Sequence, residues 1–247
     1  MKVLSKSLAI VGATVFCALP AYSATTTFDF LENDGVPGLY QQEREYEVDG
    51  LGVTISGWTT NESAGGTIGS ALIGQDEVGQ LTGRGLGVGR APSFEVDNSQ
   101  DKFDMLLFDF EDSPVALTSI SLGAIRHDSD MTILSYQGDD FDSFSGSFAG
   151  SSWEDLLDMG WVANGDYADV SLDGTDINSQ QARSRYWLVG AYNGNILGGS
   201  LSAGDDFVKV ATITVETPLP AAFVLFASGL LLLSRSRRVA ARGKKTV

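Results

Sequence analysis

One segment near the middle of the chain carries the clearest signal of secondary structure: Phe103-Asp104-Met105-Leu106-Leu107-Phe108-Asp109-Phe110. Successive side chains of a β-strand point to opposite faces of the sheet. The odd-numbered residues of this segment therefore share one face, and the even-numbered residues share the other. Its alternation and aromatic content predict a β-strand.

Similar patterns on both sides of this segment predict further strands. Gly, Asp, Asn and Ser clusters separate them, which is the chemistry of tight turns. Most of the 29 glycines fall in this part of the chain, and they favour many short connections. The predicted strands are Leu51–Thr60, Val115–Ile125, Met131–Tyr136, Arg185–Tyr192 and Phe207–Val215.

Strict alternation also assigns faces within two of these strands. In Val115–Ile125 it places Leu117 on one face and Ile120 on the other. In Phe207–Val215 it places Val210 on the face opposite Ile213.

Three other stretches complete the predicted body. Thr25–Gly50 is acidic and less regular, and suggests an edge strand with a loop. Gly83–Arg90 resembles a phosphate-binding loop only in its glycines, and Pro92 interrupts any helix after it, so we expect a flexible loop. Ser151-Ser152-Trp153-Glu154 resembles a capping box and predicts a single short helix. The predicted fold is all-β, an antiparallel β-sandwich or jelly-roll-like domain with one short helix.

Charge is divided sharply along the chain. All 32 acidic residues lie within Thr25–Thr217, whereas half of the 16 basic residues lie outside it. A middle region this acidic repels phosphate backbones, so we expect no nucleic-acid partner. The three predicted segments are residues 1–24, the acidic domain of residues 25–217, and residues 218–247.

The N-terminal segment has the composition of a secretory signal peptide. Lys2 and Lys6 precede the apolar run Leu8–Leu19, and small residues follow Pro20. Signal peptidase would cut after Ser23 or after Ala24. The apolar run is too short to span a bilayer.

The C-terminal segment combines prolines, an apolar stretch and bases. Pro218, Leu219, Pro220 and Ala221 precede the apolar residues 222–233, where we expect a membrane helix. The basic residues behind it favour retention on the cytoplasmic side, which leaves the acidic domain outside. A plain uncleaved anchor is the alternative. The basic cluster consists of Arg235, Arg237 and Arg238.

This C-terminal order resembles the PEP-CTERM-like sorting signals that exosortases process in Gram-negative bacteria, in particular the variant with a Val-Pro-Leu-Pro-Ala core. Pro218, Leu219, Pro220 and Ala221 match that core, and Thr217 stands in place of its valine. The resemblance implies that a membrane-embedded protease-transpeptidase cuts near the motif. It would release or transfer the acidic domain to the cell surface.

Parts of the acidic domain are also similar to a family of exosortase-dependent surface proteins, over roughly Ala91–Val215. That resemblance implies no enzymatic activity. The similar segments are Val96-Asp97-Asn98, Asp104–Phe110, Leu117–Gly123, Asp128-Ser129-Asp130 and Tyr186–Tyr192.

Few residues offer catalytic chemistry. Cys17 is the only cysteine and lies in the N-terminal apolar run, which excludes disulfides and Cys-based zinc sites from the domain. His127 is the only histidine, and its acidic neighbours favour a surface loop over a catalytic triad. We expect no enzyme.

Acidic turns are candidates for a hard cation, because calcium prefers carboxylate and carbonyl oxygens. The alternative is that these turns only keep an exported protein soluble. The candidate calcium ligands are Asp128 and Asp130, then Asp139, Asp140 and Asp142, with Asp173, Asp176, Asp97 and Asn98 as further oxygen donors.

Together these patterns predict a non-enzymatic exported protein of the cell surface or extracellular matrix, with a structural or adhesive role. One alternative is a calcium-assisted carbohydrate-binding module, for which Trp58 is the candidate exposed aromatic residue and Trp187 a core residue. A second alternative is a secreted glycoside hydrolase. Expected partners are signal peptidase, an exosortase-type enzyme, the membrane before processing, and extracellular polysaccharide.

Overall fold

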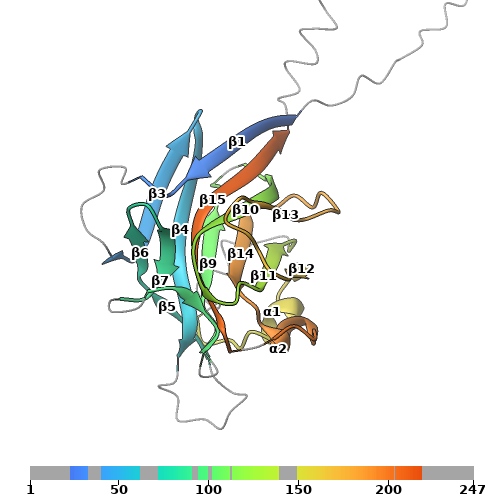
Figure 1. Cartoon of the computed structure of the whole chain (residues 1–247). Helices are drawn as coiled ribbons and strands as arrows, with labels where there is room; N and C mark the ends of the chain where they lie inside the picture. Colours follow the sequence, from blue (N-terminus) through green and yellow to red (C-terminus); the bar gives the residue numbers. More distant parts are fainter. Residues whose placement is uncertain are drawn as a thin grey trace, which may run out of the picture. The chain divides into compact units, whose positions relative to one another are not determined.

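A computed structural model of the chain describes residues 23–32, 40–61, 72–90, 94–99, 102–111, 113–138, 149–202 and 204–218. Within these residues two antiparallel sheets pack against each other as a β-sandwich, which confirms the predicted all-β class (Figure 1). The two sheets belong to one compact unit of the chain, which runs from Ser23 to Pro218.

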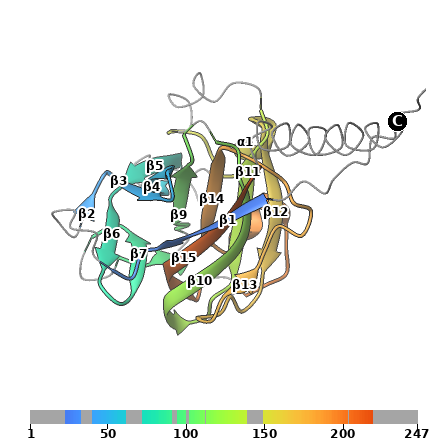
Figure 2. The ribbon, with the colours of Figure 1, turned by 90° about the horizontal axis from the view of Figure 1, so that it is seen from above.

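The first sheet contains eight strands in the order β13-β10-β15-β7-β6-β2, with β1 and β8 also paired to β15. Figure 2 shows β1 lying along β15. The strands are β1 (Ser23–Asp29), β2 (Tyr40–Gln41), β6 (Val78–Leu81), β7 (Gly85–Val88), β8 (Val96–Asp97), β10 (Ala116–His127), β13 (Thr175–Asp176) and β15 (Asp206–Pro218).

The second sheet contains seven strands in the order β12-β11-β14-β9-β4-β3, with β5 paired to β4. All of the strands predicted from the sequence are present, with ends that differ by a few residues. The strands are β3 (Glu43–Val48), β4 (Leu51–Asn61), β5 (Leu72–Asp76), β9 (Met105–Asp109), β11 (Met131–Tyr136), β12 (Trp161–Tyr167) and β14 (Tyr186–Ala191).

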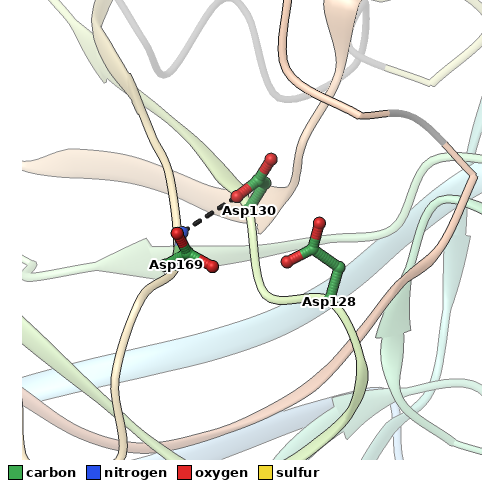
Figure 3. Close-up of side chains that lie close together, drawn as sticks. All are labelled: Asp128, Asp130 and Asp169. Atoms are coloured by element: carbon green, nitrogen blue, oxygen red, sulfur yellow. Dashed lines mark hydrogen bonds between the residues drawn. The ribbon is translucent and has the colours of Figure 1, made fainter.

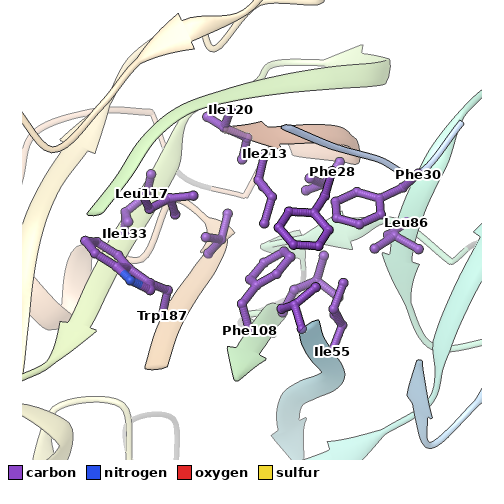
Figure 4. Packing of buried hydrophobic residues seen from close by; sticks show 14 of the residues in the cluster. Phe28, Phe30, Ile55, Leu86, Phe108, Leu117, Ile120, Ile133, Trp187 and Ile213 are labelled. Atoms are coloured by element: carbon purple, nitrogen blue, oxygen red, sulfur yellow. The ribbon is translucent and has the colours of Figure 1, made fainter. Parts of the chain in front are cut away.

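The two faces of β9 belong to two different cores, as its alternation predicts. Leu106 and Phe108 pack between the sheets with residues such as Phe28 and Trp187 (Figure 4). Met105 and Leu107 belong to a second cluster on the other face of the second sheet. Because both faces are covered, β9 lies in the interior of the domain.

Two short helices, α1 (Asp155–Asp158) and α2 (Gly194–Leu197), contribute to the second cluster. The sequence predicted only the first. Its N-terminal hydrogen bonds also begin one residue later than expected: Asp155 N donates to Ser152 Oγ, and Ser152 N donates to the Asp155 carboxylate.

Strict alternation is wrong within β10 and β15. Leu117 and Ile120 both face the core between the sheets, and so do Val210 and Ile213. The β10–β15 pairing shifts register between Leu117 and Ser119, and again on either side of Leu122. These irregularities of the β-bulge type insert an unpaired residue, so apolar side chains three positions apart reach one face.

Two segments contain more strand than the sequence predicted. Thr25–Gly50, expected to form an edge strand with a loop, contributes to β1, β2 and β3, and β3 turns into β4 through Asp49 and Gly50, both with positive φ. This is the two-residue turn that Asp-Gly favours. Gly83–Arg90 contains the buried strand β7. A Cβ on Gly85 would lie 2.1 Å from the Val210 carbonyl oxygen, so the glycines there allow two backbones to approach closely.

Candidate metal site

Five aspartates meet where three segments of the chain come together. Asp128 and Asp130 lie in the turn between β10 and β11, Asp169 follows β12, Asp205 directly precedes β15, and Asp206 begins it. One carboxylate oxygen from each of Asp128, Asp130 and Asp169 lies within 4.8 Å of the others, as does one from each of Asp128, Asp205 and Asp206. We call these five residues the aspartate cluster; Figure 3 shows the first three.

Backbone hydrogen bonds fix the three segments. Asp128 N donates to Asp205 O at 3.0 Å, and Phe207 N donates to Asp128 O at 3.3 Å. Val170 N donates to Ser129 O at 3.1 Å. Asp169 has a φ of 52°, a left-handed conformation that aspartate tolerates better than most residues. The main chain therefore fixes the segments that carry the carboxylates, of which Asp130 and Asp206 are buried, Asp128 is half-buried, and Asp169 and Asp205 are exposed.

The most enclosed carboxylate is that of Asp206, whose side chain is 0% exposed. Its Oδ1 accepts from Asp130 N at 2.7 Å, and its Oδ2 accepts from Asn98 Nδ2. Asn98 is itself buried, and its Oδ1 accepts from Gly204 N and Asp206 N. Neutral groups therefore hold this carboxylate in position without balancing its charge.

The other carboxylates also accept from neutral donors. Asp130, 4% exposed, accepts from Asp169 N at 2.9 Å. Asp128 accepts from Ser129 N and from Ser202 Oγ. Asp205 Oδ1 is buried without a hydrogen-bond partner among the described residues.

Salt bridges between described residues lie elsewhere. They join Arg90 to Glu77, Arg126 to Glu95, and Arg185 to Asp109. None includes a member of the aspartate cluster, which thus gathers negative charge without an ion pair to a described lysine or arginine.

Burial and mutual repulsion raise the pKa of two carboxyls in the cluster. Burial is the main reason that the pKa of Asp206 rises to about 7, and the charges of Asp130 and Asp128 add to the effect. Burial likewise raises the pKa of Asp130, with contributions from Asp128, Asp169 and Asp205. A bound cation would instead lower the pKa of these carboxyls, because its positive charge favours their ionised form.

The cluster contains only some of the residues predicted as ligands. Asp128 and Asp130 lie together as predicted, and Asn98 hydrogen-bonds to the cluster. Asp173 and Asp176 are exposed and belong to neither group of three. Asp139, Asp140 and Asp142 lie outside the described residues.

Sequence reasoning missed Asp169, Asp205 and Asp206. The Asp205-Asp206 pair directly before a strongly predicted strand was the available signal, because strand ends place side chains at a sheet edge. The sequence around Asp169 offered no such signal, because Asp169 reaches the aspartate cluster only through the pairing of β11 with β12.

The tryptophan and histidine residues considered as candidate site residues differ in their exposure. Trp58 is 8% exposed and packs in the second cluster, so its predicted exposure is wrong. Trp187 is 0% exposed, as predicted. His127 is exposed at the end of β10, and its ring contacts that of Phe207.

The terminal signals fall largely outside the described residues. Ser23 and Ala24 begin β1, and Pro218 ends β15. Leu219, Pro220 and Ala221, the expected membrane helix at 222–233, and Arg235, Arg237 and Arg238 are not described. In the part of the chain that is described, no helix is long and apolar enough to cross a membrane.

Comparison with known proteins gives no match to this chain, whether with family models, curated proteins or solved structures.

Proposed function

We propose that this protein is a non-enzymatic, exported protein of the cell surface or extracellular matrix, whose β-sandwich is stabilised by a calcium ion at the aspartate cluster. The single observation that carries the calcium part is the fully buried carboxylate of Asp206 beside those of Asp128 and Asp205. An ionised carboxylate in that position needs a nearby positive charge.

Calcium fits these donors better than other common ions. The candidate ligands are all oxygens, which hard cations prefer, and calcium accepts six to eight of them in flexible geometry. Zinc and copper favour histidine or cysteine, and the chain has only one of each. Magnesium demands near-ideal octahedral geometry, which carboxylates on three separate segments supply less readily.

The role of the ion would be structural. Asp128 and Asp130, Asp169, and Asp205 with Asp206 come from parts of the chain far apart in sequence. A cation held by Asp128, Asp130 and Asp169 would join the β10–β11 turn to the segment after β12, and one held by Asp128, Asp205 and Asp206 would join that turn to the start of β15. Either ion would fasten the turn that connects the first sheet to the second.

The export part of the proposal is supported by the sequence. The acidic domain lies between a signal-peptide pattern and a proline motif followed by an apolar stretch and bases. We propose that signal peptidase removes the first segment, and that an exosortase-type enzyme cuts near Pro218, Leu219, Pro220 and Ala221. The protein would be membrane-anchored before this cut and at the surface or in the matrix afterwards.

A sugar-binding role has less support. An aromatic platform needs exposed rings, and all four tryptophans are buried: Trp58, Trp153, Trp161 and Trp187. We therefore propose a structural or adhesive role in contact with extracellular polysaccharide. We propose no site at which a sugar stacks on an aromatic ring.

The intact mass of the protein recovered from its native cells tests the sorting proposal. Cells with the exosortase-type enzyme should yield a chain lacking about the last 30 residues, a length set by the position of the proline motif. Cells without it should yield the full tail in the membrane fraction. An unchanged tail in both strains would refute the sorting, and recovery from the cytosol with both ends intact would refute export.

A further inference from the structure

Strands β1 and β15 bring the beginning and the end of the β-sandwich side by side. Ser23 is opposite Pro218, Ala24 is opposite Thr217, and Thr25 is opposite Glu216. The expected signal-peptidase sites, after Ser23 or Ala24, therefore lie against the residues that lead into the proline motif.

Glu216 already contacts the residue at this cleavage site. Ser23 Oγ donates to Glu216 Oε2 at 2.8 Å across the strand pair. Arg183 contacts the backbone of Glu216 and not its carboxylate: Arg183 Nη1 donates to the Glu216 carbonyl oxygen at 2.8 Å. The Glu216 carboxylate thus points along β1 toward the start of the strand.

Cleavage changes what lies in that position. Hydrolysis of the Ser23–Ala24 peptide bond consumes one water: its oxygen bonds to the Ser23 carbonyl carbon, the bond from that carbon to the Ala24 nitrogen breaks, and the two protons of the water end on the nitrogen. The products are a carboxylate on Ser23, which leaves with the signal peptide, and an α-ammonium on Ala24. The departing serine takes with it the hydroxyl that Glu216 accepts.

We propose that the α-ammonium created by signal-peptide removal forms a salt bridge with the Glu216 carboxylate. The Ala24 nitrogen is bonded to the Ser23 carbonyl carbon, so it lies close to the hydroxyl that Glu216 now contacts. Cleavage after Ala24 would leave the ammonium on Thr25, directly opposite Glu216. Both expected cuts therefore deliver a positive charge to the same carboxylate.

This salt bridge would hold the new N-terminus of β1 against β15 close to the proline motif. The pairing of β10 with β15 ends at Ala116 and Glu216, and in the uncut chain β1 is the described strand that pairs with Thr217 and Pro218. Cleavage removes the residue opposite Pro218, so a salt bridge at Glu216 would keep the two strands together at this end of the sheet. The inference rests on the proposed export, because an uncut chain has no ammonium at this position.

The pKa of the α-amine tests this proposal in the processed protein recovered from cells. Reductive ¹³C-methylation labels the amine, and NMR follows its resonance with pH. An exposed α-amine titrates at about 7.7–8.0. We expect a pKa raised by about half a unit or more in the wild type, because the adjacent carboxylate favours the charged form.

Glu216→Gln should return the pKa to the ordinary range, whereas Glu47→Gln, which removes an exposed carboxylate on β3 of the other sheet, should leave it raised. Equal pKa values in the wild type and Glu216→Gln would overturn the salt bridge. N-terminal sequencing distinguishes failure of the salt bridge from failure of the export proposal. A chain that begins at Ala24 or Thr25 supports export even if the two pKa values are equal, whereas a chain that begins at Met1 refutes both export and the salt bridge.

Discussion

At the scale of the residue, the calcium proposal depends on where individual carboxylates lie. Asp128 belongs to both groups of three oxygens, and Asp206 is the most deeply buried member. Acidic loops are common on soluble proteins without any ion. What distinguishes this cluster is that Asp206 and Asp130 are buried while the hydrogen bonds they accept come from neutral groups.

Asp205→Asn should weaken calcium binding at least tenfold, the loss expected when a charged ligand becomes neutral. This variant is preferable to one at Asp206, because Asp205 Oδ1 has no described hydrogen-bond partner to lose. Isothermal titration calorimetry on protein freed of metal with EDTA measures the affinity. Asp158→Asn makes the same charge change at an exposed position of α1 and should bind as the wild type does. Equal affinities in all three proteins would contradict the assignment.

Protons should compete with calcium at Asp206. Its pKa of about 7 means that the carboxyl is mostly protonated at pH 6 and mostly ionised at pH 8. Calcium binds the ionised form, so the apparent Kd should be about tenfold weaker at pH 6 than at pH 8. Titrations at both pH values measure it, and a pH-independent Kd would show that Asp206 does not ionise on binding.

At the scale of the element, β1 shows what a strand contributes on each face. It pairs with β15 along its whole length, and its inward side chains include Phe28, which is 1% exposed. Its outward side chains include Thr27, whose hydroxyl hydrogen-bonds to that of Thr214. Stability should therefore depend strongly on one face of β1 and weakly on the other.

Phe28→Ala should lower the free energy of unfolding by about 3–5 kcal/mol, because it removes a buried ring from the core between the sheets. Thr27→Ala, one position earlier on the exposed face, should cost less than about 1 kcal/mol. Urea denaturation followed by tryptophan fluorescence measures both. Similar losses for the two variants would mean that β1 is not packed as described.

Elements with regular patterns could be predicted from the sequence, and those that depend on contacts between distant segments could not. The alternation around Phe108 correctly indicated a strand with two distinct faces. The shifts near Leu117 and Leu122 were not predictable, because a bulge depends on the register with β15. β7 was missed because glycine disfavours strands unless another backbone must approach closely, as Val210 does at Gly85.

The candidate site shows the same limit. Asp128 and Asp130 could be named because they are close in sequence within one turn. Asp169 and Asp206 join them only through the backbone contacts of β10, β12 and β15. Trp58 was misplaced because an adjacent polar run suggested exposure, whereas Trp153 and Met105 belong to the same cluster over that face of the second sheet.

At the scale of the whole molecule, the large negative charge bears on the stabilising role proposed for calcium. The chain carries a formal net charge of −16, with every acid in the acidic domain. Such a charge favours solubility but destabilises the compact state through self-repulsion. Extracellular calcium would offset part of that repulsion at the point where carboxylates are most concentrated.

Without calcium, the protein should lose stability as the pH rises from about 5.5 to 8. The pKa values of Asp104, Asp130 and Asp206 are all raised, mainly by burial, above those of the unfolded chain. A raised pKa means that the folded state binds protons more tightly, so the stability it confers at low pH disappears as the pH passes the folded pKa. Thermal unfolding in EDTA across this range measures the trend, and a rising Tm would contradict it.

The most direct test of a calcium-stabilised fold is differential scanning calorimetry of the processed protein at pH 8, in EDTA and in calcium at about one hundred times Kd. Binding only to the folded state at that concentration adds about 2.7 kcal/mol. For a domain of this size, the Tm should rise by roughly 5–10 °C in calcium. The same concentration of magnesium should produce a much smaller rise. A Tm that is unchanged by calcium would show that the aspartate cluster does not bind the ion, and would contradict the account.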